Sequence, residues 1–284
     1  MIRFVPAAPV TLRLGPTSYD VTRRALVMGV LNRTHDSFFA PAATFAMDDF
    51  LTRAERLVRD GADLLDVGGV KAGPGEEVGE VEEMERVVPA LELLRRRFDV
   101  PLSVDTWRAS VARESFAVGA CVGNDISGFA DPDYLPVAAA ASASVVATHI
   151  RLRPRVADPD PHYDDVTATV REFLIDRRRR AIDAGVAANR VILDAGLDLG
   201  KNAAQSLQLL RDSAQLAAEG PLLLSASNKT FLGTMFDLDV LERREASLGA
   251  AALGIAAGCR VVRVHDVRGT VRVRDALERV LEAL

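Results

Sequence analysis

Polar side chains able to bind a small molecule recur along the chain, each following a short apolar run. They are Asn32, Asp66, Asp105, Asn124, His149, Asp194, the pair Ser227 and Lys229, and Arg263 with His265. Any one of them alone is compatible with an ordinary hydrogen-bonding residue at the end of a strand. The acids and carboxamides at Asp105, Asn124 and Asp194 offer acceptors and paired donor and acceptor groups. Such groups suit a flat nitrogen heterocycle, and an aminopyrimidinone ring fits well.

A second group of side chains favours an anion. Arg263 and His265 lie two residues apart in an apolar run, so both face one side of a strand. Asn32 follows the first run, which neighbours the last one if the strands close into a barrel. Two donors or cations beside a carboxamide suit a phosphate or pyrophosphate with magnesium. The alternative is that Arg263 and His265 pair with Asp266 or with nearby helix carboxylates.

The lysines are unusual in number and place. The chain has three of them, Lys71, Lys201 and Lys229, against 32 arginines. All three lie in Gly- or Ser-rich segments that follow apolar runs, whereas surface lysines usually lie along helices. Each is therefore a candidate site residue.

The elements that must position these residues repeat one theme, a short apolar run, a polar loop and a segment with helical spacing. The runs are ALVMGVL, DLLDV, PLSV, ACVGN, SVVATH, RVILD, PLLLS and RVVRV, and the clearest helical segments span residues 48–62, 82–98, 108–120 and 166–185. Continuous apolar strands alternating with helices predict a parallel sheet covered by helices. Eight units over about 250 residues predict a closed (β/α)8 TIM barrel of the α/β class.

The N-terminal segment has a different pattern. FVPAAPVTLRLG alternates like a β-hairpin, so we predict a hairpin cap over residues 1–24 and a barrel over 25–284, together one domain spanning 1–284. The stretch RLRPRVADPDPHY after His149 has the length of a loop between a strand and a helix. It fits either a lid or a simple insertion.

Composition narrows the class of protein. A chain of 284 residues with 49% hydrophobic content can fill a large core, and its net charge of −5 argues against nucleic acid as a partner. It has neither a long apolar span nor a signal peptide, which indicates a soluble cytoplasmic protein without a membrane partner. Cys121 and Cys259 lie in apolar runs without metal-ligand spacing, as expected of reduced core thiols.

Seven segments together resemble the dihydropteroate synthase family in order and spacing. They are LNRTHDSF from Leu31, DVGGVKAGPG from Asp66, SVDT from Ser103, ND at Asn124, LDAGLDLGK from Leu193, SNKTFLG from Ser227 and RVHDV from Arg263. The resemblance runs from about Ala25 to the C-terminus. SVDT alone is a weak signal, but the set is specific.

The resemblance implies an enzyme that joins hydroxymethyl-dihydropterin pyrophosphate to para-aminobenzoate, with release of pyrophosphate and assistance from Mg²⁺. By matching position, Asp105, Asn124, Asp194 and Lys229 would bind the pterin. Asn32, Arg263 and His265 would hold the pyrophosphate, with Asn32 also on the metal. Asn32, Asp105, Lys229, Arg263 and His265 would be the catalytic residues, and no nucleophilic side chain is required. The family also implies a homodimer, and the small-residue helix from Gly249 to Gly258 permits close packing either within the barrel or across a dimer.

The chain departs from the family where para-aminobenzoate should bind. The second loop, usually Gly-Glu-Ser-Thr-Arg-Pro-Gly, here reads Gly-Val-Lys-Ala-Gly-Pro-Gly over residues 69–75, and Ser-Arg-Lys-Ser becomes Ser-Asn-Lys-Thr over 227–230. Lys71, Asn228 and Thr230 would then face the aminobenzoate. Arg33 and Lys71 add charge that offsets the lost arginines, while the first loop reads FFAPAATF and His35 replaces a usual proline. Similar departures occur in the second, divergent mycobacterial homologue.

Several hypotheses follow from the resemblance. The first is an active synthase with an altered aminobenzoate pocket and reduced sensitivity to sulfonamides, which imitate that substrate. The second is a catalytically silent pterin-binding paralogue. A third is a pterin-dependent methyltransferase domain, although the Arg263 and His265 anion site would be redundant there. A barrel acting on another phosphorylated heterocycle is the last.

Overall fold

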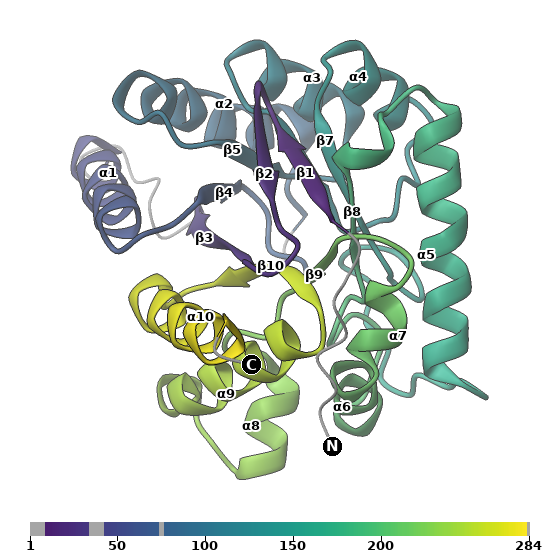
Figure 1. Ribbon diagram of the computed structural model, residues 1–284. Coiled ribbons are helices and arrows are strands. Elements are labelled where there is room, and N and C mark those ends of the chain that lie inside the picture. Colours follow the sequence, from purple (N-terminus) through teal and green to yellow (C-terminus); the bar gives the residue numbers. More distant parts are fainter. Residues whose placement is uncertain (1–8, 34–42, 74–76, 283–284) are drawn as a thin grey trace.

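The computed structural model describes residues 9–33, 43–73 and 77–282. Its parallel strands close into a barrel in the order β10-β3-β4-β5-β6-β7-β8-β9 (Figure 1). The strands are Leu26–Asn32 (β3), Leu64–Gly68 (β4), Leu102–Asp105 (β5), Val122–Asp125 (β6), Ser144–Thr148 (β7), Val191–Asp194 (β8), Leu222–Leu224 (β9) and Cys259–Val264 (β10). Each predicted apolar run forms one strand, so the predicted (β/α)8 TIM barrel is confirmed.

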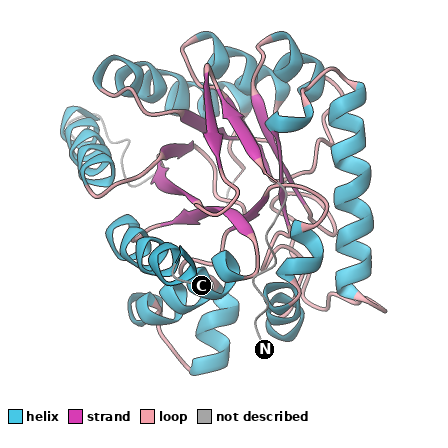
Figure 2. Cartoon of the chain, in the orientation of Figure 1, coloured by secondary structure: helices cyan, strands magenta, loops and turns pink. Residues whose placement is uncertain are grey.

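Helices surround the barrel as an outer ring (Figure 2). They are Ala43–Arg59 (α1), Glu80–Arg97 (α2), Ala109–Ala117 (α3), Tyr134–Ala140 (α4), Val166–Asp183 (α5), Ala203–Arg211 (α6), Ser213–Ala217 (α7), Thr230–Phe236 (α8), Arg244–Ala256 (α9) and Val267–Glu282 (α10), with short 3₁₀ helices at Ala188–Arg190 (η2) and Val240–Glu242 (η3). The helical segments predicted from periodicity correspond to α1, α2, α3 and α5. The helix expected over residues 249–258 overlaps α9, and no segment was predicted from the sequence for α4, α6, α7, α8 or α10.

The N-terminal hairpin consists of β1 (Thr11–Leu14) and β2 (Thr17–Asp20), paired antiparallel. It lies across one end of the barrel (Figure 1). Leu12 and Leu14 are fully buried and join an apolar cluster with residues at the beginnings of the barrel strands, such as Leu26 and Leu64. The predicted hairpin is therefore confirmed, and it closes the N-terminal end of the barrel. The assignment of residues 1–284 to one domain stays a prediction.

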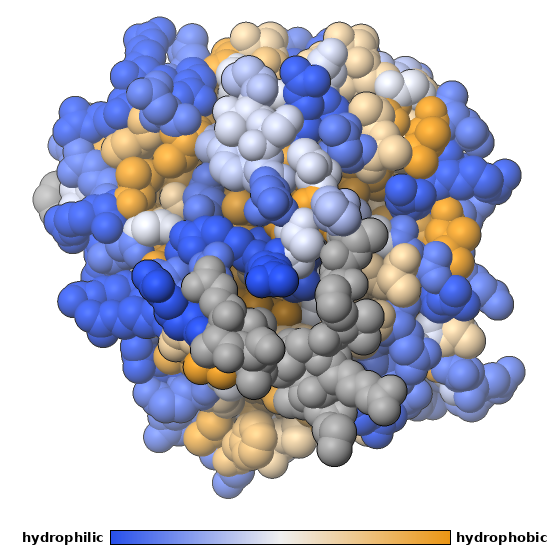
Figure 3. Space-filling view, viewed as in Figure 1, coloured by the Kyte–Doolittle hydropathy of each residue, from blue (hydrophilic) through white to orange (hydrophobic). Residues whose placement is uncertain are grey.

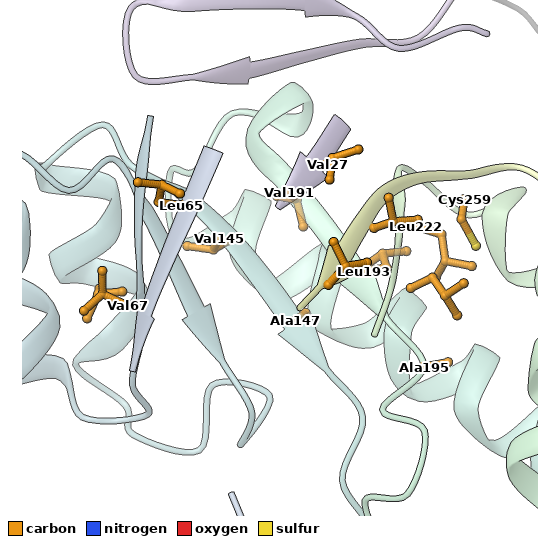
Figure 4. Packing of buried hydrophobic residues seen from close by; sticks show 14 of the residues in the cluster. Val27, Leu65, Val67, Val145, Ala147, Val191, Leu193, Ala195, Leu222 and Cys259 are labelled. Carbon is orange, nitrogen blue, oxygen red and sulfur yellow. The ribbon is translucent and has the colours of Figure 1, made fainter. Parts of the chain in front are cut away.

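The two faces of the strands pack differently because successive side chains point to opposite sides. Outward residues such as Val27, Leu65 and Val145 belong to the core between strands and helices (Figure 4). Inward residues begin as an apolar layer and continue, two positions later, as a polar one. The pairs are Leu64 and Asp66, Val122 and Asn124, Ile192 and Asp194, and Val261 and Arg263. The strand alternation thus directs the polar residues into the barrel toward its C-terminal end.

The side chains on the outer surface differ in character from those of the core. Hydrophilic residues dominate the periphery of the face in Figure 3, where the outer helices lie. Among the residues that the structure describes, no helix has the length and apolar character needed to cross a membrane. Cys121 and Cys259 are free thiols, as predicted.

Candidate active site

The polar layer is a connected hydrogen-bond network across the barrel. Oδ2 of Asp66 accepts hydrogen bonds from Nδ2 of Asn124 at 3.1 Å and from Nε of Arg263 at 2.6 Å. Nη2 of Arg263 also donates to Oδ2 of Asp105 at 2.8 Å. Strands β4, β5, β6 and β10 therefore bring one cation, two carboxylates and a carboxamide together, although β10 is far from the others in the sequence.

These contacts correct one alternative considered from the sequence. Within the described residues, Arg263 pairs with the barrel carboxylates of Asp66 and Asp105 and not with Asp266 or a helix carboxylate. Asp266 instead contacts Nε of Arg244 at 2.8 Å and accepts a hydrogen bond from the backbone of Gly269. The reason is the strand alternation, which places Arg263 on the inner face of β10.

One oxygen of the network has unused capacity. Oδ1 of Asp66 is buried and finds no hydrogen-bond donor among the described residues, while the whole residue is 0% exposed. A buried acceptor without a partner costs free energy, and a ligand N–H group aimed at it would remove that cost. The layer is thus suited to a ligand that donates hydrogen bonds.

Burial also shifts the protonation of the carboxyl groups. It raises the pKa of Asp105 to about 7; the Arg263 guanidinium opposes the rise, and the nearby Asp66 carboxylate adds to it. Burial raises the pKa of Asp194 as well, against the Lys229 and Lys201 ammonium groups. For Arg263, burial alone would lower the pKa, but the Asp66 and Asp105 carboxylates outweigh it and hold the pKa above its ordinary value. Arg263 is therefore a permanent cation beside a carboxyl group that titrates near neutral pH.

Lys229 reaches the same region from the loop after β9. Its Nζ donates to the carbonyl oxygen of Leu197 at 2.5 Å, and burial lowers its pKa while the Asp194 carboxylate raises it. Oδ1 of Asp194 accepts a hydrogen bond from the backbone of Gly196 at 2.8 Å. The loop after β8 therefore fixes both a carboxylate and an ammonium group. Asp198 in that loop also accepts hydrogen bonds from the backbone of Thr230 and Phe231, at the start of α8.

Lys201 was a candidate site residue because lysine is rare in this chain, and it contacts the loop after β8. Its Nζ lies 2.9 Å from Nδ1 of His149 and donates to the carbonyl oxygens of Gly196 and Leu199 at 2.9 and 3.0 Å. Lys201 and His149 are both buried. Lys201 otherwise contacts the backbone of the loop after β8, and the His149 ring packs edge-on against Phe173 of α5 with the ring centroids 4.9 Å apart. We therefore infer that these two residues hold that loop in place.

Asn32 and His265 lie at the rim of the polar layer. Asn32 is exposed at the end of β3, and its Oδ1 is 3.7 Å from the position that a Cβ atom on Gly68 would occupy. Asp105 borders the same position at 3.4 Å, so Asn32 and Asp105 share one edge. His265 is half-buried just beyond β10, and its Nδ1 lies 3.0 Å from Oγ of Ser227. Burial lowers the pKa of His265 to about 4, helped by the charges of Arg263, Arg53 and Lys229.

The described residues offer few side-chain ligands for a magnesium ion. No cluster of three or more His, Cys, Asp or Glu residues able to hold a metal occurs within the part of the chain described here. The exposed Asn32 carboxamide is a single oxygen ligand. Mg²⁺ commonly binds proteins through one or two oxygen ligands and completes its shell with substrate phosphates and water. The residues present therefore fit a magnesium ion that a phosphate ligand shares.

The predicted aminobenzoate residues are more scattered. Lys71 and Thr230 are exposed, and Asn228 is half-buried with a left-handed φ of 59° and a backbone N–H that donates to Oγ of Ser247. Arg33 packs against α1, where its guanidinium lies over the Phe50 ring at 5.2 Å and contacts the Met47 sulfur. The predictions for His35, for the segment FFAPAATF and for Pro74 and Gly75 fall wholly or mainly outside the described residues.

The loop after β7 lies against the loop after β4. The backbone N–H of Arg155 donates to the carbonyl oxygen of Ala72 at 3.1 Å, and its Nη1 donates to that of Lys71 at 3.0 Å. Arg151 pairs with Asp158 within the same loop. The Pro- and Asp-rich stretch is thus anchored at the edge of the site, on the side of the altered second loop.

Fold and site together define a (β/α)8 barrel enzyme of the pterin-binding class. The family model described as pterin binding enzyme matches residues 28–265. The protein named inactive dihydropteroate synthase 2 of Mycobacterium tuberculosis strain H37Rv is 43% identical over 259 residues, covering 89% of this chain and 81% of that protein. Dihydropteroate synthase of Escherichia coli K12 is 36% identical over 269 residues, covering 94% and 95%.

Solved structures agree with these relatives. The Yersinia pestis dihydropteroate synthase in a sulfonamide drug complex superimposes with a TM-score of 0.90 at 36% identity, covering 97% of this chain and 100% of that one. The Burkholderia cenocepacia enzyme complexed with 7,8-dihydropteroate gives a TM-score of 0.86 at 38% identity, covering 97% and 98%. This chain belongs to the dihydropteroate synthase family.

The structure adds two residues to the candidate site that the sequence alone did not assign to it. Asp66 and Ser227 stood out in the sequence as polar residues near strand ends, but neither was assigned to a ligand. Asp66 is the centre of the network with Asn124 and Arg263, and Ser227 contacts His265. The available signal for Asp66 was its position two residues after Leu64 on the inner face of β4.

Proposed function

We propose that the protein is a dihydropteroate synthase that condenses hydroxymethyl-dihydropterin pyrophosphate with para-aminobenzoate in folate biosynthesis. The observation that carries this proposal is the polar layer, where Asp66, Asn124 and Arg263 form a buried network with an unsatisfied carboxylate oxygen. Pterins present N–H donors along one edge of the ring, which such an oxygen can accept. The polar layer also matches the residues expected for this substrate.

We propose a separate role for each group of site residues. Asp105, Asn124, Asp194 and Lys229 grip the pterin ring, and Asp66 joins them through its free oxygen. Arg263, His265 and Asn32 would hold the pyrophosphate, and the half-buried His265 and exposed Asn32 at the rim support this role. As the methylene carbon–oxygen bond breaks, these donors stabilise the negative charge that develops on the leaving pyrophosphate. The amine nitrogen of para-aminobenzoate forms the new carbon–nitrogen bond and loses one proton to solvent.

Magnesium would be held jointly by Asn32 and the pyrophosphate oxygens. When bound, it supplies additional positive charge for the leaving group. Within the protein, Arg263 keeps a fixed charge on the same side because the Asp66 and Asp105 carboxylates hold its pKa high.

The acceptor pocket is proposed to be altered. The second loop lacks the threonine and arginine of the family pattern, and Asn228 replaces the arginine beside Lys229. Lys71 and Thr230 are exposed at this side and remain available to a carboxylate. Sulfonamides imitate para-aminobenzoate, so losing these groups should weaken the drug if the natural substrate keeps other contacts.

A second candidate function is a pterin-binding protein without turnover. The observation that favours it is the 43% identity to the mycobacterial relative whose name marks it as inactive. In this case the pterin residues would be retained for binding, and the altered second and seventh loops would leave the acceptor without a productive position.

One assay separates the two candidates. Purified protein is incubated with hydroxymethyl-dihydropterin pyrophosphate, Mg²⁺ and para-aminobenzoate, and pyrophosphate release and pteroate formation are followed against a sulfonamide titration. Turnover that persists at high drug concentration supports the synthase with an altered pocket. Calorimetric binding of the pterin pyrophosphate without product supports the silent paralogue, and the absence of binding would contradict both.

We also propose a cytoplasmic homodimer. The free thiols of Cys121 and Cys259 are compatible with a reducing compartment. Gly254 of α9 packs so closely on Leu224 that an added Cβ would lie 2.4 Å from its Cδ2, so this part of the small-residue helix serves packing within the barrel. Leu253, the residue before Gly254 in α9, is 58% exposed. Light scattering of the purified chain tests the dimer.

A further inference from the structure

Ser227 and His265 make two contacts with each other. Oγ of Ser227 lies 3.0 Å from Nδ1 of His265, and the same Oγ accepts a hydrogen bond from the backbone N–H of His265 at 3.2 Å. Ser227 follows β9, and His265 comes directly after β10. The pair therefore joins two neighbouring loops at the rim, one of them carrying Lys229.

The number of hydrogens on the hydroxyl group determines how this pair bonds. A serine hydroxyl has one hydrogen to donate and two lone pairs to accept with. One lone pair is used by the backbone N–H of His265. In the described part of the chain, Nδ1 of His265 is the acceptor within reach of the hydroxyl hydrogen. A donated hydrogen bond from Ser227 to Nδ1 uses the hydroxyl fully, and it requires Nδ1 to be without a proton.

We propose that Ser227 is a positioning residue that fixes His265 in the tautomer with the proton on Nε2. The ring is then a neutral hydrogen-bond donor toward an anion at the rim. The tautomer is decisive only for a neutral ring, because a protonated imidazole donates from both nitrogens. Burial favours that neutral ring most, and the cations Arg263, Arg53 and Lys229 act in the same direction.

The consequence for the reaction rests on the proposed function. With the proton on Nε2, His265 can donate to an oxygen of the departing pyrophosphate while Arg263 supplies the fixed charge. With the proton on Nδ1, Nε2 would present a lone pair to that oxygen and repel it. Ser227 would therefore favour leaving-group binding without touching the substrate itself.

The first test reads the tautomer directly and does not depend on turnover. The chain has four histidines, so a ¹⁵N-histidine-labelled sample gives few NMR signals, and the His265→Gln variant identifies those of His265. In the unliganded protein near pH 7, we expect an unprotonated Nδ1 and a protonated Nε2. In Ser227→Ala we expect a mixture of tautomers, and in Ser227→Thr, which keeps a hydroxyl group, the original state. A protonated Nδ1 in the parent protein, or an unchanged spectrum in Ser227→Ala, would overturn the proposal.

The second test measures anion binding with inorganic pyrophosphate and Mg²⁺ as the probe. Ser227→Ala should bind it about fivefold to tenfold more weakly by calorimetry, the equivalent of about one hydrogen bond, and Ser227→Thr should bind like the parent. An expected spectrum without turnover would contradict the synthase function and leave the Ser227 assignment standing. Equal affinity of the parent and Ser227→Ala would contradict the assignment itself.

Discussion

Nε of Arg263 lies 2.6 Å from Oδ2 of Asp66, so the last strand of the barrel is joined to the second by an ion pair inside it. The Asp66 side chain is 0% exposed and that of Arg263 is 18% exposed. The same carboxylate oxygen accepts a hydrogen bond from Asn124, which extends the link to β6. Removing one member of a buried pair leaves the other charge without compensation.

Asp66→Asn should therefore destabilise the protein by about 3 kcal/mol, at the lower end for such pairs because Arg263 keeps Asp105. Urea denaturation measures the free energy of unfolding. Glu55→Gln is the matched control, since it removes an exposed ion pair with Arg97 and should cost less than about 1 kcal/mol. Equal losses in the two variants would contradict a structural role for the Asp66 and Arg263 pair.

A second prediction concerns pH. An Asp in an unfolded chain has a pKa of about 3.9, and the pKa of Asp105 is raised to about 7, chiefly by burial. A raised carboxyl pKa gives stability that is fully present below the unfolded pKa and is lost as the pH rises through the folded one. The unliganded protein should therefore lose stability between about pH 4 and pH 7.

Asp105→Asn should make that decline shallower, as seen in melting temperatures across this range. It should not abolish the decline, because burial also raises the pKa of Asp125 to about 6. An identical slope in the parent and Asp105→Asn would show that Asp105 ionises normally.

The buried ammonium group of Lys201 leads to a third prediction. Lys201→Met removes the donor shared by His149 and the carbonyl oxygens of Gly196 and Leu199. We expect a loss of about 1 to 3 kcal/mol of stability, the cost of buried acceptors left unpaired. Because the loop also carries Leu197, the partner of Lys229, pterin affinity should fall by about tenfold. Lys71→Met, at an exposed lysine, is the control and should change stability by less than about 0.5 kcal/mol.

Two glycines should respond in opposite directions to alanine. Gly196 has a φ of 64°, and an added Cβ would lie 1.9 Å from the carbonyl oxygen of His149, so Gly196→Ala should prevent normal packing of the loop after β8. For Gly249 in α9, no atom of the described part of the chain lies within 4 Å of that position. Gly249→Ala should therefore stabilise the helix by about 0.5 to 1 kcal/mol. Thermal unfolding of both variants provides the comparison, and a stable Gly196→Ala variant would disprove the predicted clash.

The altered second loop allows a direct test of drug sensitivity. Among the described residues, no atom lies within 4 Å of a Cβ added to Gly73, so the first carbon of the arginine side chain in Gly73→Arg meets no obstacle there. If the lost arginine explains weak sulfonamide binding, Gly73→Arg should tighten inhibition by about tenfold, within the range of one charge-assisted hydrogen bond. Gly79→Arg, equally unobstructed but located at the start of α2, controls for added charge. Equal inhibition of both variants and the parent would indicate that other residues set the sensitivity.

Much of this architecture was accessible from the sequence because barrel strands are written as continuous apolar runs. The runs ending near Leu31, Val67 and Asp194 each became a strand, and the residue after or within each run reached the barrel mouth. The partners of those residues were not accessible. The contact between Arg263 and Asp66 depends on the closure of β10 against β3, the neighbour of β4. It also requires that both side chains point into the barrel from β10 and β4, and no local sequence pattern encodes this.

The same limit explains Lys201. Its rarity and its Gly-rich surroundings marked it as unusual, and the same rarity marked Lys229. Only the folded loop separates the two, since Lys201 turns back to His149 while Lys229 extends to Leu197.

The N-terminal hairpin covers one end of the barrel, and the polar layer lies toward the other end. Leu12 and Leu14 pack below the polar layer, against apolar residues at the beginnings of the barrel strands. In the proposed reaction, both reactants and both products would pass through the opposite, C-terminal end. The reactant that binds deepest would then have to bind first. It could leave only after the molecule bound above it had left.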